Sequence, residues 1–343
     1  MPDTVHQCIH DIVEEKVRSQ PDAPAICSWD GGLTYSELSH LSTGLASQLM
    51  KNGVGPEVLV PLCFEKSMWT PVAMLGVLKA GGAFVLLDSS LPELRLKAIV
   101  EQTNADLVIS SEANLNLSSR LSRNVLPVGP ASTDLSKTTS ISNPLGQSPS
   151  SAMFAVFTSG STGEPKGVIL THSNFSSSLK HQAKALGFKR DSRVFDFASY
   201  AFDIAVHNPF AAFTSGACLC IPSENERKED VGKAMARMRV TIADLTPSVA
   251  RLVDPVTVPD LKTIIFAGEA LALDDVTRWW NKADIVNAYG PAECNISTIN
   301  AGAKEPQEAT HIGRGVGLVT WIVDPDNHNS LLPPGCTGEL VLE

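Results

Sequence analysis

The stretch that decides the fold is the apolar run Met153-Phe-Ala-Val-Phe157, followed by Thr158-Ser-Gly-Ser-Thr-Gly-Glu-Pro-Lys-Gly167 and then Val168-Ile-Leu170. This pattern predicts a buried strand that enters a Gly/Ser-rich loop and continues into a second strand. Small residues let backbone amides converge on an anion, while hydroxyls and a lysine add donors and charge. We therefore predict a polyphosphate-binding loop, with these ligands: Thr158, Ser159, Gly160, Ser161, Thr162, Gly163 and Lys166.

Two other interpretations of this loop are a Walker A loop and an exposed Ser/Gly hairpin. A Walker A loop needs Gly-Lys in direct succession, whereas Glu164 and Pro165 separate Gly163 from Lys166 here, so the P-loop NTPase class fails on spacing. An exposed Ser/Gly hairpin is a common structure, but the lysine after proline and the density of hydroxyls disfavour it.

Strand and helix patterns alternate along the rest of the chain. Thr34-Tyr-Ser-Glu37 has the form of a capping box and precedes leucines at helical spacing up to Leu49. The predicted strands are 58–64, 83–87, 106–110, 153–157, 194–197, 217–221, 242–245, 263–266 and 285–288, and further helices are predicted at 71–80 and 93–104. This rhythm predicts an α/β fold with two mainly parallel β-sheets and flanking helices.

The segment 129–151 is dense in Ser, Thr, Asn, Gly and Pro, which predicts a connector. We accordingly expect subdomains at approximately 1–128 and 152–300, and the start of a β-rich subdomain at 301–343.

Composition limits the classes of function. The chain has 343 residues, 43% hydrophobic and 19% charged, which is typical of a globular enzyme. A formal net charge of −10, without a Lys/Arg cluster, argues against nucleic acid and anionic membranes as partners.

Seven scattered cysteines indicate reduced thiols, and Cys218-Leu-Cys220 is expected to be a pair of strand thiols, not a metal site. No apolar run approaches the roughly 18 residues of a membrane span, so we expect a cytoplasmic protein.

The phosphate loop resembles that of the adenylate-forming superfamily, and further segments narrow the resemblance. In chain order these are Leu33-Thr-Tyr-Ser-Glu-Leu38, Leu78-Lys-Ala-Gly-Gly-Ala-Phe-Val-Leu-Leu-Asp88, Phe202-Asp203, Asn287-Ala-Tyr-Gly-Pro-Ala-Glu293 and Gly338-Glu-Leu-Val-Leu342. They resemble the signatures of adenylation domains of nonribosomal peptide synthetases, and their wording is similar to that of fungal members. The resemblance covers nearly the whole chain and implies the large N-terminal lobe of the adenylate-forming fold, with a small β-barrel-like subdomain.

The resemblance also implies an ATP/AMP site. Tyr289 would stack on adenine, Asn287 and the backbone near Gly268 would bind its edge, and Glu293 would hold Mg²⁺ against the phosphates. Thr158, Lys166 and Glu293 would be the catalytic residues of this portion. The remaining nucleotide-binding positions are Ala288, Gly290 and Ala292. Where the family commonly has threonine this chain has Ala292, which removes one hydrogen bond to phosphate, worth about 0.5–1.5 kcal/mol.

Alignment on the same motifs implies the amino-acid pocket. Its positions are Asp203, Ile204, His207, Asp244, Ile265, Ala267, Ala288, Ile296 and Ser297. Asp203 would pair with the substrate's α-ammonium, which favours an amino acid over an acid-only substrate. Asp244 is a second acid, so we expect a side chain with a cation or an N–H donor; the alternative is that Asp244 points away and leaves a hydrophobic pocket.

The sequence ends at Glu343, before the position at which the family has its ribose-binding segment, hinge and C-terminal lid. Because the family's catalytic lysine belongs to that lid, we expect the chain alone to bind better than it turns over. The implied reaction converts an amino acid and ATP to aminoacyl-AMP and pyrophosphate, for transfer to phosphopantetheine on a peptidyl carrier domain, with a condensation domain as a further partner. A free-standing acyl-CoA or aryl-acid ligase core and a noncatalytic binding module are the alternatives.

Overall fold

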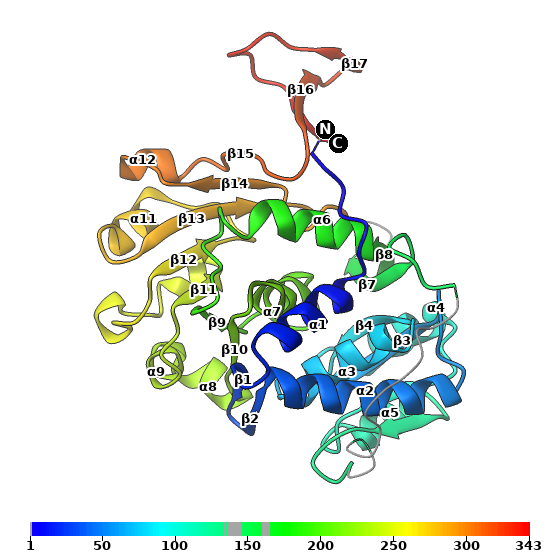
Figure 1. The fold of residues 1–343 in the computed structure, drawn as a ribbon. Helices are drawn as coiled ribbons and strands as arrows, with labels where there is room; N and C mark the ends of the chain where they lie inside the picture. Colours follow the sequence, from blue (N-terminus) through cyan, green and yellow to red (C-terminus); the bar gives the residue numbers. More distant parts are fainter. Residues whose placement is uncertain (1, 133–134, 136–145, 160–164) are drawn as a thin grey trace.

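Two large β-sheets with helices around and between them form the body of the protein (Figure 1). The computed structural model describes residues 2–132, 135, 146–159 and 165–343. Four of the predicted phosphate ligands, Gly160, Ser161, Thr162 and Gly163, lie outside the described residues, as do parts of the predicted connector.

The first sheet has six strands in the order β6-β5-β3-β4-β7-β8. Its strands are β3 (Leu59–Phe64), β4 (Ala83–Asp88), β5 (Val108–Ser110), β6 (Val125–Pro127), β7 (Ala152–Ser159) and β8 (Pro165–Thr171). Four of its five neighbouring pairs are parallel, and only β7 and β8 pair antiparallel. The predicted strand at 153–157 is therefore confirmed as part of β7, on one side of the phosphate loop.

The second sheet has nine strands in the order β15-β14-β13-β12-β11-β9-β10-β1-β2. Its strands are β1 (Pro24–Ser28), β2 (Gly31–Thr34), β9 (Arg193–Phe195), β10 (Cys218–Ile221), β11 (Ile242–Leu245), β12 (Thr263–Phe266), β13 (Asp284–Tyr289), β14 (Thr298–Ala301) and β15 (Arg314–Gly315). Five of its eight pairs are parallel. Two mainly parallel sheets, as predicted, are thus confirmed.

Sheet membership crosses the boundary drawn from the sequence. β1 and β2 come from the first 34 residues but extend the nine-stranded sheet, because β1 pairs with β10. β7 and β8 come from beyond residue 151 but complete the six-stranded sheet, because β7 pairs with β4. The division at 128 and 152 stays a prediction about subdomains, and each sheet draws strands from both sides of it.

Helices cover the sheets and fill the space between them (Figure 1). They are α1 (Ile9–Ser19), α2 (Tyr35–Lys51), α3 (Trp69–Lys79), α4 (Glu93–Thr103), α5 (Leu115–Leu121), α6 (His172–Gln182), α7 (Ile204–Ser215), α8 (Glu224–Glu229), α9 (Val231–Arg237), α10 (Pro247–Ala250), α11 (Leu273–Trp279) and α12 (Pro306–Ala309), with a 3₁₀ turn at Pro255–Thr257. The capping box at the start of α2 is confirmed: Thr34 Oγ1 accepts from the Glu37 N–H at 3.2 Å, and the Thr34 N–H donates to Glu37 at 2.7 Å.

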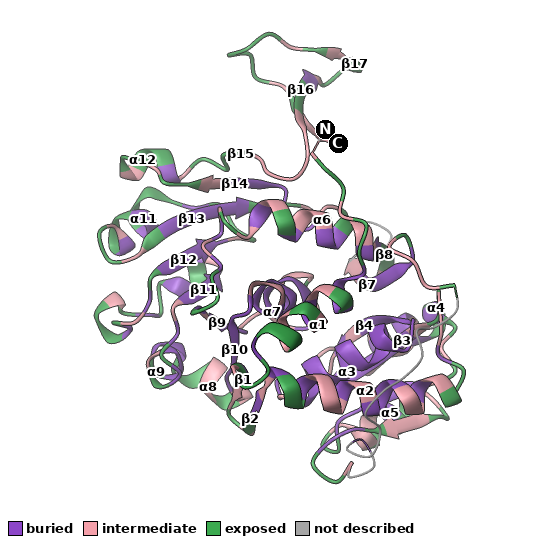
Figure 2. Cartoon of the chain, in the orientation of Figure 1, coloured by how far each residue is buried: buried purple, intermediate pink, exposed green. Residues whose placement is uncertain are grey.

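The core joins the two sheets through α7, which is almost entirely buried (Figure 2). Phe210 of α7 stacks on Phe84 of β4 with 6.3 Å between ring centroids, and Phe84 stacks on Phe154 of β7 at 5.9 Å. The same apolar cluster includes Ile265 of β12 and Val286 of β13. Because α7 packs against both sheets, the residues at its N-terminus are held between them.

A buried ion pair also connects the sheets. Lys66, just after β3, donates from Nζ to Asp196, just after β9, at 2.8 Å, and their side chains are only 1% and 2% exposed. The ammonium group also lies 4.2 Å from the centroid of the Tyr200 ring. Burial lowers the pKa of Lys66, and the Asp196 carboxylate opposes this effect.

The C-terminal segment forms a separate three-stranded antiparallel sheet in the order β17-β16-β18. Its strands are β16 (Thr320–Asp324), β17 (Asn327–Leu331) and β18 (Glu339–Leu342), which extend away from the body in Figure 1. The predicted β-rich segment is confirmed, but in the part of the chain that the structure describes it is an open sheet and not a closed barrel. Over those same residues, none of the helices has both the length and the apolar character that crossing a bilayer requires.

Candidate nucleotide and amino-acid site

The predicted site residues gather where three parallel strands of the nine-stranded sheet end. Register pairs Asp244 of β11 with Ile265 of β12, and Phe266 of β12 with Asn287 of β13. Ala267 and Gly268 directly follow β12, and Tyr289 is the last residue of β13, so all three lie at the same edge of the sheet. In open α/β sheets, ligands bind at the carboxyl ends of the strands, so this edge is the expected binding face.

A tight turn after β13 brings the last pocket residues back to the sheet. A Cβ atom on Gly290 would lie 1.6 Å from the Asn295 carbonyl oxygen, so only glycine fits there. The turn closes when the Ser297 N–H donates to the Tyr289 carbonyl at 2.8 Å. Ile296 and Ser297, at 3% and 0% exposure, thereby lie directly before β14, whose Thr298 pairs with Tyr289 of β13. Gly290 of the sequence motif thus permits a tight turn that reverses the direction of the chain.

Asn287 has one end of its carboxamide fixed. Its Nδ2 donates to the carbonyls of Ala309, Thr310 and His311, each at 3.1 Å. Because three acceptors hold the nitrogen, the orientation of the group is defined and the carboxamide oxygen is left for another partner. The sequence alone did not indicate this anchoring role, since residues 309–311 carry no recognisable motif.

Tyr289 and Glu293 are accessible to a ligand. The Tyr289 ring is 43% exposed, which is unusual for a large aromatic side chain at the end of a buried strand. Glu293 is exposed in the turn that follows, close enough to Asp203 that its charge contributes to raising the pKa of that carboxyl group. Ala292, between them, packs partly buried against the core.

Two acids lie in the interior next to this edge. Asp203 is half-buried and immediately precedes α7, and Asp244 is 6% exposed on β11. Burial raises the pKa of Asp203 to about 6, with a smaller contribution from Glu293. Burial also raises the pKa of Asp244 to about 7, and the neighbouring Asp203 charge adds to the effect. The two carboxyl groups are therefore close enough to repel each other.

Neither acid has a cationic partner in the part of the chain that the structure describes. Burial, backbone N–H groups and the Glu293 charge act on the pKa of Asp203, and burial and the Asp203 charge act on the pKa of Asp244. His207, one turn into α7, cannot supply the charge at neutral pH, because burial lowers its pKa to about 4. At the predicted pocket positions, three buried polar atoms lack hydrogen-bond partners among the described residues: Asp244 Oδ2, His207 Nε2 and Ser297 Oγ.

Apolar residues form the rest of the predicted pocket. Ile265, Ala288 and Ile296 are buried in the core cluster that contains α7, and Ile204 and Ala267 pack against it. Among the nine residues that the sequence alignment placed in the pocket, Asp244 pairs in register with Ile265, and the charge of Asp203 acts on Asp244. Their role toward a substrate stays a prediction.

The phosphate-loop residues that the structure describes belong to the other sheet. Thr158 of β7 pairs with Lys166 of β8 in the antiparallel register, and the Lys166 side chain is exposed. β7 and β8 are therefore the two sides of the loop predicted to bind phosphate. Ser159 is the last residue of β7.

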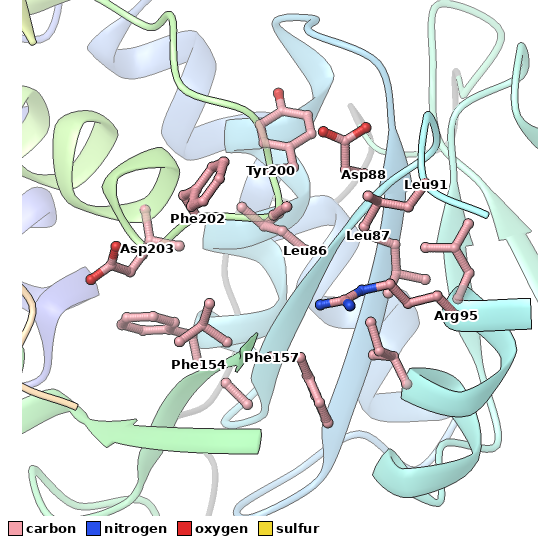
Figure 3. Close-up of a pocket in the computed structure, with 16 residues that line it drawn as sticks. Leu86, Leu87, Asp88, Leu91, Arg95, Phe154, Phe157, Tyr200, Phe202 and Asp203 are labelled. Atoms are coloured by element: carbon pink, nitrogen blue, oxygen red, sulfur yellow. The ribbon is translucent and has the colours of Figure 1, made fainter. Parts of the chain in front are cut away.

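A small cavity lies between β4, β7, α4 and the segment that leads into α7. Its volume is about 20 Å³, enough for one water molecule, and it is lined by residues of β4, β7 and α4 and by 200–203 (Figure 3). Arg95 of α4 extends into it in Figure 3, and the Arg95 Nε atom is buried without a partner in the described part of the chain. Sequence reasoning missed Arg95, because an arginine on an amphipathic helix normally indicates a solvated face.

Fold and site together define an α/β enzyme of the adenylate-forming class. The AMP-binding enzyme family matches residues 13–343, and the chain belongs to this family. An ATP/AMP-binding site follows from this membership.

The chain is similar to segments of large fungal synthetases. It is 59% identical to peramine synthetase A of Epichloe festucae and 58% identical to the nonribosomal peptide synthetase dtxS1 of Metarhizium robertsii, in both cases over 100% of this chain. It spans only 12% and 4% of the length of these two relatives.

Solved structures confirm the fold. The nonribosomal peptide synthetase FmoA3 matches with a TM-score of 0.86 at 24% identity, over 99% of this chain and 37% of FmoA3. The anthranilate CoA ligase AuaEII matches with a TM-score of 0.87 at 20% identity, over 98% of this chain and 69% of that one. Because both kinds of enzyme match equally well, the fold does not distinguish an amino-acid substrate from an aryl acid.

Proposed function

We propose that this chain is the adenylation core of a nonribosomal peptide synthetase, which binds ATP and an amino acid and forms aminoacyl-AMP with release of pyrophosphate. The observation that carries the proposal is the half-buried Asp203 next to Asp244, without a protein cation among the described residues. Buried carboxylates need a cation or several donors, and the α-ammonium of an amino acid supplies a cation. An aryl or fatty acid would add a further negative charge and no compensation.

The nucleotide would bind across the ends of the two sheets. Tyr289 offers an exposed aromatic face for adenine, and the anchored Asn287 leaves its carboxamide oxygen to accept from an amino group such as that of adenine. Thr158 and Lys166, on β7 and β8, would contact the phosphates. The main contribution of these residues to the reaction would be positioning and charge neutralisation, which bring the substrate carboxylate in line with the α-phosphorus.

Mg²⁺ fits the site because Glu293 presents an exposed carboxylate near the acid pair, and hard cations favour carboxylate and phosphate oxygens. When bound, the ion would neutralise phosphate charge. Transfer of the aminoacyl group to a phosphopantetheine thiol on a carrier domain, in a chain that also holds a condensation domain, is part of this proposal; it is supported by the large relatives of which this chain matches a small part.

We further propose that the substrate side chain carries an N–H donor. The unpartnered atoms of Asp244, His207 and Ser297 can accept or exchange hydrogen bonds, and Ala267 and Ala288 leave volume around them. Preference of the protein for leucyl or phenylalanyl ligands over every donor-bearing side chain would contradict this part alone.

Binding of nonhydrolysable adenylate mimics tests the function directly. A 5′-O-(aminoacyl)sulfamoyl adenosine keeps the α-ammonium, and its des-amino analogue removes only that group. Across a panel of side chains, calorimetry should find at least one aminoacyl ligand bound at least 10-fold more tightly than its des-amino partner, as charge-assisted hydrogen bonds contribute about 1.5–3 kcal/mol. Equal or tighter binding of des-amino or benzoyl analogues throughout the panel would instead support the acid-only ligase.

A further inference from the structure

Three cysteines and an arginine meet on one face of the nine-stranded sheet, away from the proposed ligand site. In the parallel pair of β1 and β10, Cys27 lies directly opposite Cys220. In the next pair, Cys218 of β10 lies opposite Arg193 of β9. Directly paired residues of neighbouring strands project to the same face, and residues two apart on one strand share that face. The three thiols are therefore neighbours.

The spacing of the strands permits a bond between two of these thiols. Neighbouring strands lie about 4.8 Å apart, which falls inside the Cα–Cα range of roughly 4.4–6.8 Å found for disulfides. Cys220 is fully buried, whereas Cys27 is partly exposed at the edge of the cluster that α9 covers. An oxidant in solution can therefore reach Cys27 first.

The surroundings of Cys27 favour its thiolate. A hydrogen bond from the Cys220 thiol is the largest cause, and hydrogen bonding and charge from Arg193 add to it, so that the pKa of Cys27 falls to about 5 despite partial burial. Arg237 of α9, whose guanidinium also pairs with Glu226 at 2.7 Å, contributes at longer range. The hydrogen bonds between Cys220 and its two neighbouring thiols raise its own pKa, so Cys220 remains the protonated donor.

We propose that Cys27 and Cys220 form a peroxide-sensitive thiol pair, in which Cys27 is the reactive thiol and Cys220 is the resolving thiol. A low-pKa, accessible cysteine next to a second cysteine is the arrangement found in redox-sensing sites. The Cys27 thiolate attacks hydrogen peroxide and breaks the O–O bond, which gives Cys27 sulfenic acid and, after protonation, one water. The Cys220 thiol then attacks the sulfenic sulfur and releases a second water. Both cysteines are oxidised by one electron each, and one peroxide is reduced to two waters.

Peptide mapping tests the pair. The reduced chain is treated with one equivalent of hydrogen peroxide, alkylated, and digested with trypsin without reduction. We expect the peptide 19–51, which holds Cys27, to be linked to 194–227, which holds both Cys218 and Cys220. The link should persist in Cys218→Ala and disappear in Cys220→Ser, where the serine hydroxyl can still donate to Cys27 and dimedone should label Cys27 as sulfenic acid. Exposed Cys336 should remain reduced and serve as the internal control.

A second measurement does not depend on oxidation. The rate of alkylation of Cys27 by iodoacetamide should follow a pH profile with its midpoint near 5, well below the roughly 8.5 of a free cysteine. Oxidation of Cys336 before Cys27, a link that survives Cys220→Ser, or an alkylation midpoint for Cys27 at about 8.5 or above would each overturn the proposal.

Discussion

Two pairs of buried charged groups lie at the same end of the core, and they differ in whether the protein supplies the counter-ion. Lys66 and Asp196 form a closed ion pair of opposite charges, 2.8 Å apart and almost inaccessible to solvent. Asp203 and Asp244 are two acids whose pKa values are both raised, without a cation among the described residues. Asp196 and Asp203 are only seven positions apart along the chain, yet Asp196 is paired with a cation and Asp203 is not.

This difference distinguishes buried charges that stabilise the fold from buried charges that a ligand completes. A buried charge with a complete set of partners belongs to the fold, and removing one partner leaves the other uncompensated. A buried charge without partners costs free energy in the unliganded protein, and a ligand that brings the missing charge recovers it. On this reasoning Lys66 and Asp196 hold the two sheets together, and we propose that Asp203 and Asp244 mark the place of a cationic substrate.

The largest expected effect comes from opening the closed pair. Lys66→Met leaves the Asp196 carboxylate buried and unpaired, which should reduce the free energy of unfolding by about 3–5 kcal/mol in urea titrations. Lys262→Met is the matched control, since Lys262 and Asp191 are 3.6 Å apart with side chains 67% and 72% exposed, and it should cost less than about 1 kcal/mol. Similar losses of unfolding free energy in the two variants would contradict a special structural role for the Lys66–Asp196 pair.

The next effect concerns the open pair and its pH dependence. Asp244 has a folded pKa of about 7 against 3.8 for an ordinary aspartate, so the folded state holds a proton that the unfolded state has lost between these values. Its contribution to stability therefore falls as pH rises from about 4 to about 7. Asp244→Asn removes this loss and should become progressively more stable than the wild type over that window, by on the order of 2–4 kcal/mol at pH 8.

The wild type and the Asp244→Asn variant are compared at each pH because buried histidines change the free energy of unfolding with pH in the opposite direction. Burial lowers the pKa of His10 and His207 to about 4 and that of His172 to about 3, so their contributions rise with pH up to about 6.5. Subtracting wild-type from variant unfolding free energies at each pH cancels these terms. A flat difference for Asp244→Asn would show that Asp244 is ionised at neutral pH without cost.

The smallest expected effect on stability belongs to the exposed aromatic ring. Tyr289→Ala should change the free energy of unfolding by no more than about 0.5 kcal/mol, because the ring is 43% exposed. The same change should weaken AMP binding roughly 3- to 10-fold, since stacking on an aromatic ring contributes about 0.5–1.5 kcal/mol beyond buried area. Tyr289→Phe retains the ring and should bind like the wild type in calorimetry. Equal affinities of the alanine and phenylalanine variants would remove Tyr289 from the adenine site.

Local patterns predicted the strands that carry the site. β11 and β12 have the bounds expected from their apolar runs at 242–245 and 263–266, because short buried strands of a parallel sheet are apolar throughout. The β1–β2 hairpin was missed, since its two strands are short and their partner, β10, lies almost 200 residues further along the chain. Pairing over such a distance is determined by tertiary packing and leaves no periodic signal in the sequence.

The same limit applies to the site. Motif alignment named Asp203, Asp244 and Tyr289, because their chemistry is visible in residue type. It could not indicate that Lys66 meets Asp196 across 130 residues or that Arg95 extends into a cavity beside β7. Partners that meet only through folding are visible only in the structure. Here they determine that the charge of Asp196 is balanced by a protein cation and that the charges of Asp203 and Asp244 are not.

The central claim, that the open acid pair receives the α-ammonium of an amino acid, is tested most directly by proton release on binding. Calorimetry of the tightest aminoacyl sulfamoyl adenosine at pH 6, in buffers of different ionisation enthalpy, counts the protons exchanged. At this pH about half of the Asp203 carboxyl groups are protonated in the free protein, and Asp244 is mostly protonated. We expect a net release of protons, because an approaching ammonium ionises the pair, with a smaller release in Asp203→Asn and none with the des-amino ligand. No release from the wild type, or equal release with both ligands, would contradict it.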